Sequence, residues 1–262
     1  MKLETKGRSL TVFVPALNEE RDIELAVKSI SSASRKVLSD VELVIVNDGS
    51  TDRTGEIADR LARELKDVRV IHHPRRRGLG AAYQSAVEAA TKDYFVFIPG
   101  DNSWPHESLL ELFCFLGVAD VVTSYATNPW ARRGGIPRRF VSAGYTKILN
   151  MLYGLRLRYF NGLTIYPVVY LKTKPVKTFG FGFAAEALLH SIFRGMSYTE
   201  IGLPIQELEG GISKAITTKN IASVFSTIAR CYWEIRVRKI YGTRPQGVRV
   251  VAPRSRKLGP SL

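Results

Sequence analysis

The stretch that most constrains the fold is VELVIVNDGSTD, residues 41–52. Its first half is a nearly continuous run of Val, Leu and Ile, which is typical of a strand buried on both faces of a parallel sheet. The polar residues from Asn47 to Ser50 end that strand abruptly, and a helical pattern of apolar residues follows at 57–65. Asp48 is therefore expected at the carboxyl end of a buried strand, the edge where open α/β sheets bind their ligands. A carboxylate there can accept hydrogen bonds from a base or a ribose, or Asp48 and Ser50 can simply form an Asx turn.

Strand and helix patterns alternate through the first half of the chain. Besides 41–46, strands are expected at 9–15, 68–72, 94–98 and 120–124, with helical patterns between them. Alternation at this spacing predicts an α/β fold with a doubly wound, mostly parallel sheet and helices on both faces. Four of these strands end in polar or glycine-rich segments, which we expect at one edge of the sheet: 15–20, 48–52, 75–80 and 100–103.

The pattern changes after residue 125. A segment rich in Pro, Gly and Arg at 126–139 precedes a long helix expected at roughly 138–154. The last helix is expected at about 217–240. The remaining residues, 243–262, are rich in Pro and Arg and are expected to form a disordered basic tail.

The net charge of the chain is +14, from 38 Lys and Arg against 24 Asp and Glu. This balance predicts anionic partners, which can be nucleic acid, phosphates or an anionic membrane surface. No nucleic-acid-binding motif accompanies the basic residues, so nucleic acid is not the expected partner. Cys114 and Cys231 fall in apolar helical segments, which indicates buried thiols in a reducing compartment. No apolar run reaches the roughly 18 residues needed to span a bilayer, and the N-terminus lacks the apolar stretch of a secretory signal.

Four segments occur in an order and spacing that resemble the inverting family 2 glycosyltransferases, which have the GT-A fold. They are VPALNEE, VNDGSTDRT, HHPRRRGLGAAYQSAV and IPGDNSWPHESL. The resemblance covers residues 9–125 well. From 126 to 214 it is looser and closest to the polyprenyl-phosphate branch, the dolichol-phosphate-mannose synthase type. It implies a GT-A domain at 1–216, with a nucleotide-sugar half at 9–125 and an acceptor half at 126–216, then an amphipathic helix at 217–242 and the basic tail.

The resemblance implies a nucleotide-diphospho-sugar donor. Glu19 and Asp48 can accept hydrogen bonds from the base or the ribose. Gly78 and Gly80 either let the backbone approach the ligand or serve strand–helix packing, and Arg77 supplies positive charge. The implied donor-binding residues are Pro15, Leu17, Glu19, Asp48, Ser50, Arg77, Gly78, Gly80 and Gly100.

Asp101 lies where the family carries its Asp-x-Asp metal motif. The resemblance implies that Asp101 binds Mg²⁺ or Mn²⁺ and takes part in catalysis, because the cation offsets charge on the leaving diphosphate. Pro99 replaces the first Asp of the motif, so a single carboxylate remains. Asn102 or Ser103 can add an oxygen ligand. With a single carboxylate, metal binding is expected either to be weaker or to depend on the phosphates of the substrate. Alternatively, Asp101 only forms a turn.

Glu186 is the carboxylate in FGFGFAAEALLH, the segment that matches the family's general-base region. It can deprotonate a sugar hydroxyl, although a phosphate acceptor needs no base, or it can be an exposed helix residue. The branch also implies phosphate-binding roles for Arg138, Arg139, Ser213 and Lys214. Two departures from the branch are Tyr125 and Leu208, which stand where Arg is usual.

We therefore expect inverting transfer of a sugar to a polyprenyl phosphate or another membrane-associated acceptor. The alternatives are a family 2 transferase with a soluble sugar or glycan acceptor, and a non-catalytic GT-A module that binds nucleotide sugars.

The helix at 217–240 is the expected site of contact with an anionic membrane surface. Its features are an apolar stripe and C-terminal cations, which together predict peripheral attachment at the cytoplasmic face with help from the basic tail. Alternatively, the helix packs on the sheet and its cations suit the helix dipole. The stripe consists of Ile221, Val224, Phe225, Ile228, Tyr232 and Ile235, and the cations are Arg230, Arg236, Arg238 and Lys239.

Overall fold

The structure is a computed structural model that describes residues 8–129, 135–173, 176–178, 180, 182–206, 218–241 and 247–251. These residues form a seven-stranded sheet in the order β3-β2-β1-β4-β6-β5-β7. Strand β6 is antiparallel to both neighbours, and the other pairs are parallel. The predicted α/β fold with a mostly parallel sheet is confirmed. The strands are β1 (Ser9–Ala16), β2 (Asp40–Asn47), β3 (Val68–His72), β4 (Tyr94–Phe97), β5 (Val121–Ala126), β6 (Thr164–Pro167) and β7 (Tyr198–Leu203).

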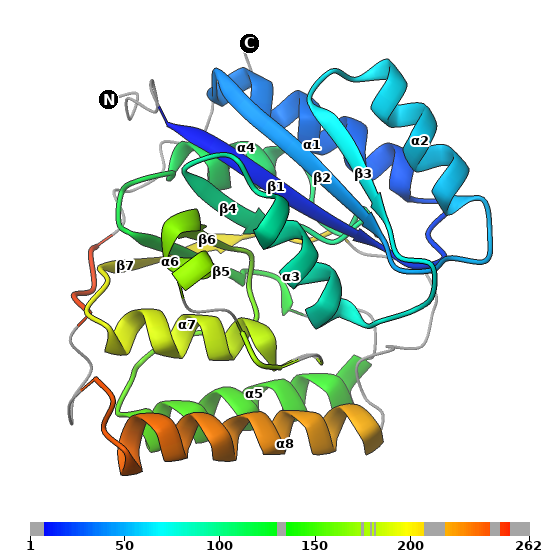
Figure 1. Ribbon diagram of the computed structural model, residues 1–262. Coiled ribbons are helices and arrows are strands. Elements are labelled where there is room, and N and C mark those ends of the chain that lie inside the picture. Colours follow the sequence, from blue (N-terminus) through cyan, green and yellow to red (C-terminus); the bar gives the residue numbers. More distant parts are fainter. Residues whose placement is uncertain are drawn as a thin grey trace.

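Helices cover both faces of this sheet (Figure 1). One face carries α1 (Ile23–Val37), α2 (Thr54–Glu64) and α4 (His106–Cys114). The other face carries α3 (Leu79–Ala89), α6 (Val168–Thr173) and α7 (Phe183–Phe193). Two further helices, α5 (Gly135–Tyr153) and α8 (Thr218–Tyr232), lie side by side as an outer layer, with α7 between them and the sheet.

Alternating side chains of the central strands enter two separate apolar cores. In β2, Leu43 and Ile45 pack toward α1 and α2, whereas Val44 and Val46 pack toward α3. All four are fully buried. Successive side chains of a strand point to opposite faces, so a strand covered on both sides needs an apolar residue at each position. This explains the continuous apolar run that organises the sequence.

The parallel strands bring the four polar segments to one edge, which we call the carboxyl edge. Ala16 of β1 pairs with Asn47 of β2, and Asn47 pairs with His72 of β3. Phe13 of β1 pairs with Phe97 near the end of β4. The loops after these strands therefore meet at the carboxyl edge, as predicted.

The C-terminal helix differs from its prediction. Helix α8 ends at Tyr232, and a π-helical turn, Trp233–Val237, follows it. Ile235 is fully buried and Ile228 packs against the core, so the predicted free apolar stripe is wrong at these two positions. Phe225 and Tyr232 of that stripe are exposed. The side chain of Ile221 lies outside the described residues.

Part of the expected basic tail pairs with the sheet. The backbone N–H of Tyr198 donates to the Val248 carbonyl at 2.9 Å, and the N–H of Val250 donates to the Tyr198 carbonyl at 2.7 Å. The expectation of disorder is therefore wrong for residues 247–251, because they lie along the edge of β7. No helix among the described residues is long and apolar enough to cross a membrane.

Candidate functional site

The loops after β1 and β2 are joined by hydrogen bonds at the carboxyl edge. The backbone N–H of Asn18 donates to Ser50 Oγ at 3.1 Å, and the N–H of Thr51 donates to Asn18 Oδ1 at 2.9 Å. The N–H of Glu19 donates to Thr54 Oγ1 at 2.8 Å. The Ser50 hydroxyl, expected at the donor, therefore also fixes the loop that carries Glu19.

Asp52 adds a charged contact to the same pair of loops. Desolvation opposes its ionisation, but hydrogen bonds from the side chain and backbone of Thr54 and from the Glu20 backbone outweigh it and lower the pKa of Asp52. Its charge therefore favours the arrangement of these loops.

Asp48 is buried and holds the loop that follows β3. Its Oδ1 accepts hydrogen bonds from His73 Nδ1 at 2.7 Å and from the Arg77 backbone N–H at 2.8 Å. Its Oδ2 accepts one from the Gly78 N–H at 2.8 Å. A carboxylate oxygen has two lone pairs, so Oδ2 can still accept a hydrogen bond from a ligand. Asp48 thus combines a structural role with a spare acceptor lone pair on Oδ2.

His73 is a buried residue that sequence analysis did not identify. Its Nε2 lies 3.0 Å from the Ser85 hydroxyl of α3. Because an ionised carboxylate only accepts hydrogen bonds, His73 Nδ1 donates to Asp48, while Nε2 contacts the Ser85 hydroxyl on the other side of the ring. The signal available in the sequence was its position directly after a strand that pairs with the Asp48 strand.

Two glycines allow this loop its close approach. Gly49 has a φ of +71°, and a Cβ there would lie 2.5 Å from the Arg76 nitrogen, so the loop backbone packs directly on it. Gly78 has φ 95° and ψ 159°, a conformation that is essentially restricted to glycine. The backbone conformation at this position therefore requires glycine, whether or not a ligand lies beside it. Gly80 is buried in the first turn of α3, and the side chain of Arg77 is exposed.

The loop after β4 packs against the end of β1. A Cβ on Gly100 would lie 2.9 Å from the Pro15 carbonyl oxygen, so this contact requires glycine. Oδ1 of Asp101 accepts a hydrogen bond from the Ser103 N–H at 3.1 Å, which is an Asx turn. Asp101 is half-buried, and its Oδ2 has no hydrogen bond to any described residue. The turn predicted as the alternative is present, and it leaves one carboxylate oxygen open.

The donor set at Asp101 fits a cation that is shared with a ligand. No group of three or more His, Cys, Asp or Glu among the described residues could hold a metal ion alone. A hard cation such as Mg²⁺ is held by one or two carboxylates and completes its coordination with phosphate oxygens and waters. Asp101 Oδ2, with the half-buried Ser103 beside it, fits such a site.

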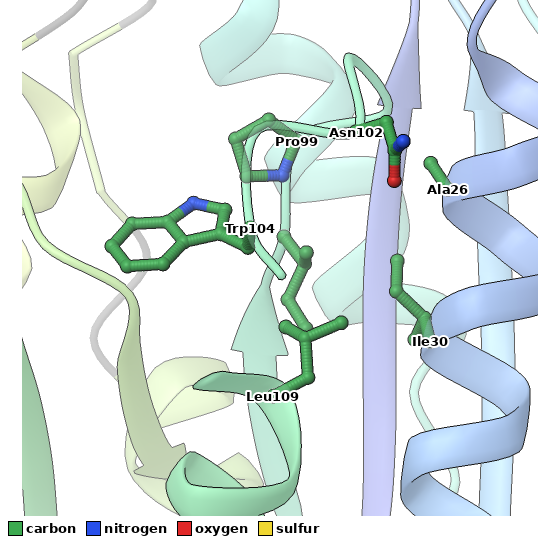
Figure 2. A pocket seen from close by; sticks show the side chains of 7 residues that line it. Ala26, Ile30, Pro99, Asn102, Trp104 and Leu109 are labelled. Atoms are coloured by element: carbon green, nitrogen blue, oxygen red, sulfur yellow. The ribbon is translucent and has the colours of Figure 1, made fainter. Parts of the chain in front are cut away.

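A small hollow lies behind this loop (Figure 2). In the figure, Asn102 points toward α1, away from the side of the loop to which Trp104 turns. The hollow has a mostly apolar lining and a cavity volume of about 10 Å³, the space of at most one water molecule, whereas pockets for small-molecule ligands span roughly 300–1,000 Å³. It therefore does not mark the binding site. Its lining residues are Ala26, Ile30, Ile98, Pro99, Asn102, Trp104 and Leu109.

Glu186 does not present a free carboxylate. It is 3% exposed and accepts hydrogen bonds from the backbone N–H groups of Lys177 at 2.9 Å and Thr178 at 3.1 Å. The Thr178 hydroxyl donates to it at 2.5 Å, and Arg230 Nη2 of α8 at 2.7 Å. The exposed-helix alternative is wrong, because this side of α7 faces α8. The general-base role of Glu186 stays a prediction, for a carboxylate that is already engaged in hydrogen bonds. Glu186 fastens α8 and the segment 177–178 to α7.

A second polar cluster fastens the chain beyond α8. Glu234 forms an ion pair with Lys177 at 2.7 Å, and its Oε2 lies 3.5 Å from Nε2 of His190 on α7. His190 Nδ1 lies 3.2 Å from the Tyr241 hydroxyl. Together with Glu186 and Arg230, these contacts make α8 an integral part of the fold.

The residues expected to bind the acceptor phosphate are only partly described. Arg139 is exposed on α5, whereas the side chain of Arg138 and all of Ser213 and Lys214 lie outside the described residues. At Tyr125, where Arg is usual, the Arg158 guanidinium lies 4.7 Å from the ring centroid, and its Nη1 donates to the Tyr125 hydroxyl at 2.8 Å. A cation is thus present at the end of β5, supplied from a distant part of the chain.

A comparison with protein families and characterised relatives gives consistent matches. The model of the family described as glycosyl transferase family 2 matches residues 11–168. The chain is 27% identical over 241 residues to polyprenol monophosphomannose synthase of Mycolicibacterium smegmatis, which covers 87% of each protein. It is 28% identical over 245 residues to glycosyltransferase AglD of Haloferax volcanii, covering 88% of this chain and 38% of AglD. It is 40% identical over 93 residues to the uncharacterized glycosyltransferase EpsJ of Bacillus subtilis. The match to EpsJ covers 36% of this chain and 26% of EpsJ, so the chain spans well under half the length of EpsJ or AglD.

Solved structures share the fold. The UDP complex of glucosyl-3-phosphoglycerate synthase from Mycobacterium tuberculosis matches with a TM-score of 0.66 and 21% identity, covering 86% of this chain and 80% of that one. A complex of the same enzyme with Mn²⁺, UDP-glucose and phosphoglyceric acid matches with a TM-score of 0.62 and 22% identity, covering 85% and 80%. Likeness at this identity shows the fold, and the expected GT-A architecture is confirmed.

Proposed function

Because the chain belongs to glycosyl transferase family 2, we propose that it transfers a sugar, with inversion, from a nucleotide-diphospho-sugar to a polyprenyl phosphate or another membrane-associated acceptor. The observation that carries this proposal is the meeting of three features at the carboxyl edge. They are the spare acceptor lone pair on Asp48 Oδ2, the glycine-rich loop that Asp48 holds, and the carboxylate oxygen of Asp101 that has no hydrogen bond to a described residue.

The donor lies across the carboxyl edge in this proposal. Asp48 Oδ2 and Glu19 accept hydrogen bonds from the base or ribose, and the exposed Arg77 pairs with the diphosphate. The ends of β1 and β4, at Pro15, Leu17 and Gly100, line the same edge. Structures of glucosyl-3-phosphoglycerate synthase that contain UDP with Mn²⁺ or Mg²⁺ support a nucleotide diphosphate and a cation in this fold.

Asp101 and Ser103 would hold Mg²⁺ or Mn²⁺ together with the donor diphosphate. The bound cation offsets the negative charge that develops as the nucleoside diphosphate leaves. Asp101 contributes Oδ2, while its Oδ1 keeps the Asx turn in place through the Ser103 N–H.

A phosphate acceptor suits the polar groups of the second half of the chain. Glu186 is engaged by Arg230 and Thr178, so it is not available to deprotonate a sugar hydroxyl. An ionised phosphate needs no general base: its oxygen attacks the anomeric carbon directly, and the bond to the nucleoside diphosphate breaks on the opposite face. The cations of Arg139 and Arg158 can pair with that phosphate. The relatives named for polyprenol and undecaprenyl phosphate support this acceptor class.

A soluble acceptor is the second candidate. Glucosyl-3-phosphoglycerate synthase shares the fold over 85% of this chain, and its solved structures contain phosphoglyceric acid. Such an acceptor also carries a phosphate, so the same cations would serve it.

The test is a transfer assay with radiolabelled UDP- and GDP-sugars, Mg²⁺ or Mn²⁺, and a panel of acceptors. The panel holds a polyprenyl phosphate in detergent, 3-phosphoglycerate, and buffer alone. We expect a labelled, acid-labile lipid product that forms only with the polyprenyl phosphate. Transfer to the soluble acceptor alone would refute the lipid assignment, and the lack of transfer from any donor would refute the activity.

The acceptor also bears on where the protein works. A polyprenyl chain resides in a bilayer, whereas nucleotide sugars are dissolved in the cytoplasm. We therefore propose that the protein acts peripherally at the cytoplasmic face of a membrane.

A further inference from the structure

Exposed apolar side chains gather on the outer helical layer. Phe140 and Met151 of α5 are 74% and 75% exposed, and Trp233 after α8 is 59% exposed. We use the name α5/α8 face for the surface formed by the exposed apolar residues of these helices and the π-helical turn. They are Phe140, Val141, Ile148, Met151, Phe225, Tyr232, Trp233 and Val237.

The spacing of these residues shows that each helix has two apolar sides. On α5, Phe140, Ile148 and Met151 recur at intervals that share one helical face, whereas Leu149 and Tyr153 are buried on the other. Helix α8 and the π-helical turn after it follow the same arrangement, because Phe225, Tyr232 and Trp233 are exposed while Cys231 and Ile235 are buried. The buried sides hold the helices to the fold, so the exposed sides are not needed to complete the core.

The charges on this layer are of one sign. Residues 135–158 contain no Asp or Glu, and residues 218–241 contain only Glu234. Glu234 is buried and paired with Lys177. The two segments therefore expose no carboxylate among the described residues, while they expose the cations Arg139, Lys147, Arg156, Arg238 and Lys239.

This combination selects one kind of partner. Large exposed apolar patches mark interaction sites on monomeric proteins, and aromatic residues, Met and Arg also occur in protein–protein interfaces. The charge, which is of one sign over the whole layer, favours an anionic surface instead. Trp and Tyr with apolar neighbours and flanking Lys and Arg are typical of helices that lie on anionic bilayers. We propose that the α5/α8 face is the surface through which this protein lies on an anionic lipid bilayer.

The location of the face agrees with the proposed function, on whose membrane-borne acceptor this inference rests. Strand β5 ends at Ala126 on the carboxyl edge, and α5 begins at Gly135. Arg139, a proposed phosphate-binding residue, is therefore on the same helix as Phe140 and Met151. A bilayer on this face would present a lipid phosphate beside the carboxyl edge while the prenyl chain stays in the membrane.

The test uses a variant that adds charge to the face and a control that adds the same charge elsewhere. The test variant is Phe140→Asp with Met151→Asp. The control is Leu25→Asp with Val169→Asp, which alters two residues that are 60% and 74% exposed on α1 and α6. All four positions are exposed, so both proteins should fold, as thermal unfolding can verify.

Binding is measured by co-sedimentation with phosphatidylcholine vesicles, with and without phosphatidylglycerol, at low and high salt. We expect the wild type and the control to bind anionic vesicles at low salt. The test variant should bind at least about tenfold more weakly. Lys147→Glu should weaken binding at low salt only, whereas Lys66→Glu, a charge change on an exposed residue after α2, should not.

Three results would overturn the inference. The wild type could stay in the supernatant with anionic vesicles, or the test variant could bind as well as the control. The wild type could also be a dimer that the test variant dissociates, which would make the face an interface between copies.

Transfer to a short-chain, water-soluble polyprenyl phosphate separates this inference from the proposed function. Activity there without vesicle binding refutes only the surface, and binding without activity refutes only the reaction.

Discussion

The Nδ1 atom of His73 lies 2.7 Å from Oδ1 of Asp48, and this contact joins the ends of β2 and β3. Both side chains are buried, and the same carboxylate receives the backbone N–H groups of Arg77 and Gly78. Asp48 and His73 therefore hold in position the loop of Arg77 and Gly78, which contacts the donor in our proposal.

The Asp48→Ala substitution should weaken nucleotide binding. It removes a spare acceptor from the donor site and leaves the N–H groups of Arg77 and Gly78 unpaired, a loss of about 1–3 kcal/mol. Isothermal titration with UDP and GDP in the presence of Mg²⁺ measures the change. Asp40→Ala is the control, because Asp40 is on the same strand at its opposite end. Equal affinity of both variants for the nucleotide would contradict the role of Asp48.

The His73→Leu substitution should lower both stability and nucleotide affinity. Asp48 would lose a buried hydrogen-bond donor, which destabilises the fold by about 1–3 kcal/mol. His72→Leu is the matched control, because His72 is exposed and its contact with Asp59 at the surface contributes less than about 1 kcal/mol. His72 also contacts the Asn47 amide at 3.1 Å, so the control measures the loss of a histidine beside the same loops without the loss of the Asp48 contact. Urea unfolding and nucleotide titration of the two variants give the comparison. If His73→Leu changes neither quantity more than His72→Leu does, the positioning role is wrong.

The Asp101→Asn substitution should lower turnover by about 10²–10³-fold while the fold stays intact. The amide still has an oxygen that can accept the Ser103 N–H, so the turn survives, but it lacks the negative charge that a cation requires. Chelation of divalent metal should have a similar effect on the wild type. Steady-state kinetics with added Mg²⁺ measures the turnover, and circular dichroism checks that the fold is intact. Full activity of the variant, or of the wild type in chelator, would contradict metal binding at Asp101.

The Glu186→Gln substitution should act on stability. The buried carboxylate pairs with Arg230, and the removal of one partner of such a pair costs about 3 kcal/mol. Arg230→Met should lower the free energy of unfolding by a similar amount. The double variant should lower it by less than the sum of the two single effects, because the two residues interact. Chemical unfolding measures all three proteins. Unchanged stability with a loss of turnover would favour the general-base prediction.

The sequence predicted the parts of the fold that depend on local pattern. The buried strand at 41–46 was recognisable because both faces of β2 are covered, and parallel pairing then placed the segment of Asp48 beside the end of β1, against which Gly100 also packs. Asp101 was identified through the order of the motifs.

Contacts between distant segments could not be predicted in this way. Glu186 is buried because Arg230, 44 residues later in the sequence, reaches it from α8. Arg158 reaches Tyr125 across 33 residues. Periodicity showed that α8 is amphipathic, but it could not show that Ile235 faces inward while Trp233 faces outward.

The segment 247–251 has a consequence for how this protein behaves in solution. A strand at the border of a sheet presents unpaired backbone groups that can recruit a strand from another molecule. Here Val248 and Val250 occupy the backbone groups of Tyr198, so the chain itself covers the start of β7. Deletion of this short segment would expose those backbone groups of the edge strand β7. The shortened protein would then aggregate more readily, even with all of its proposed catalytic residues present.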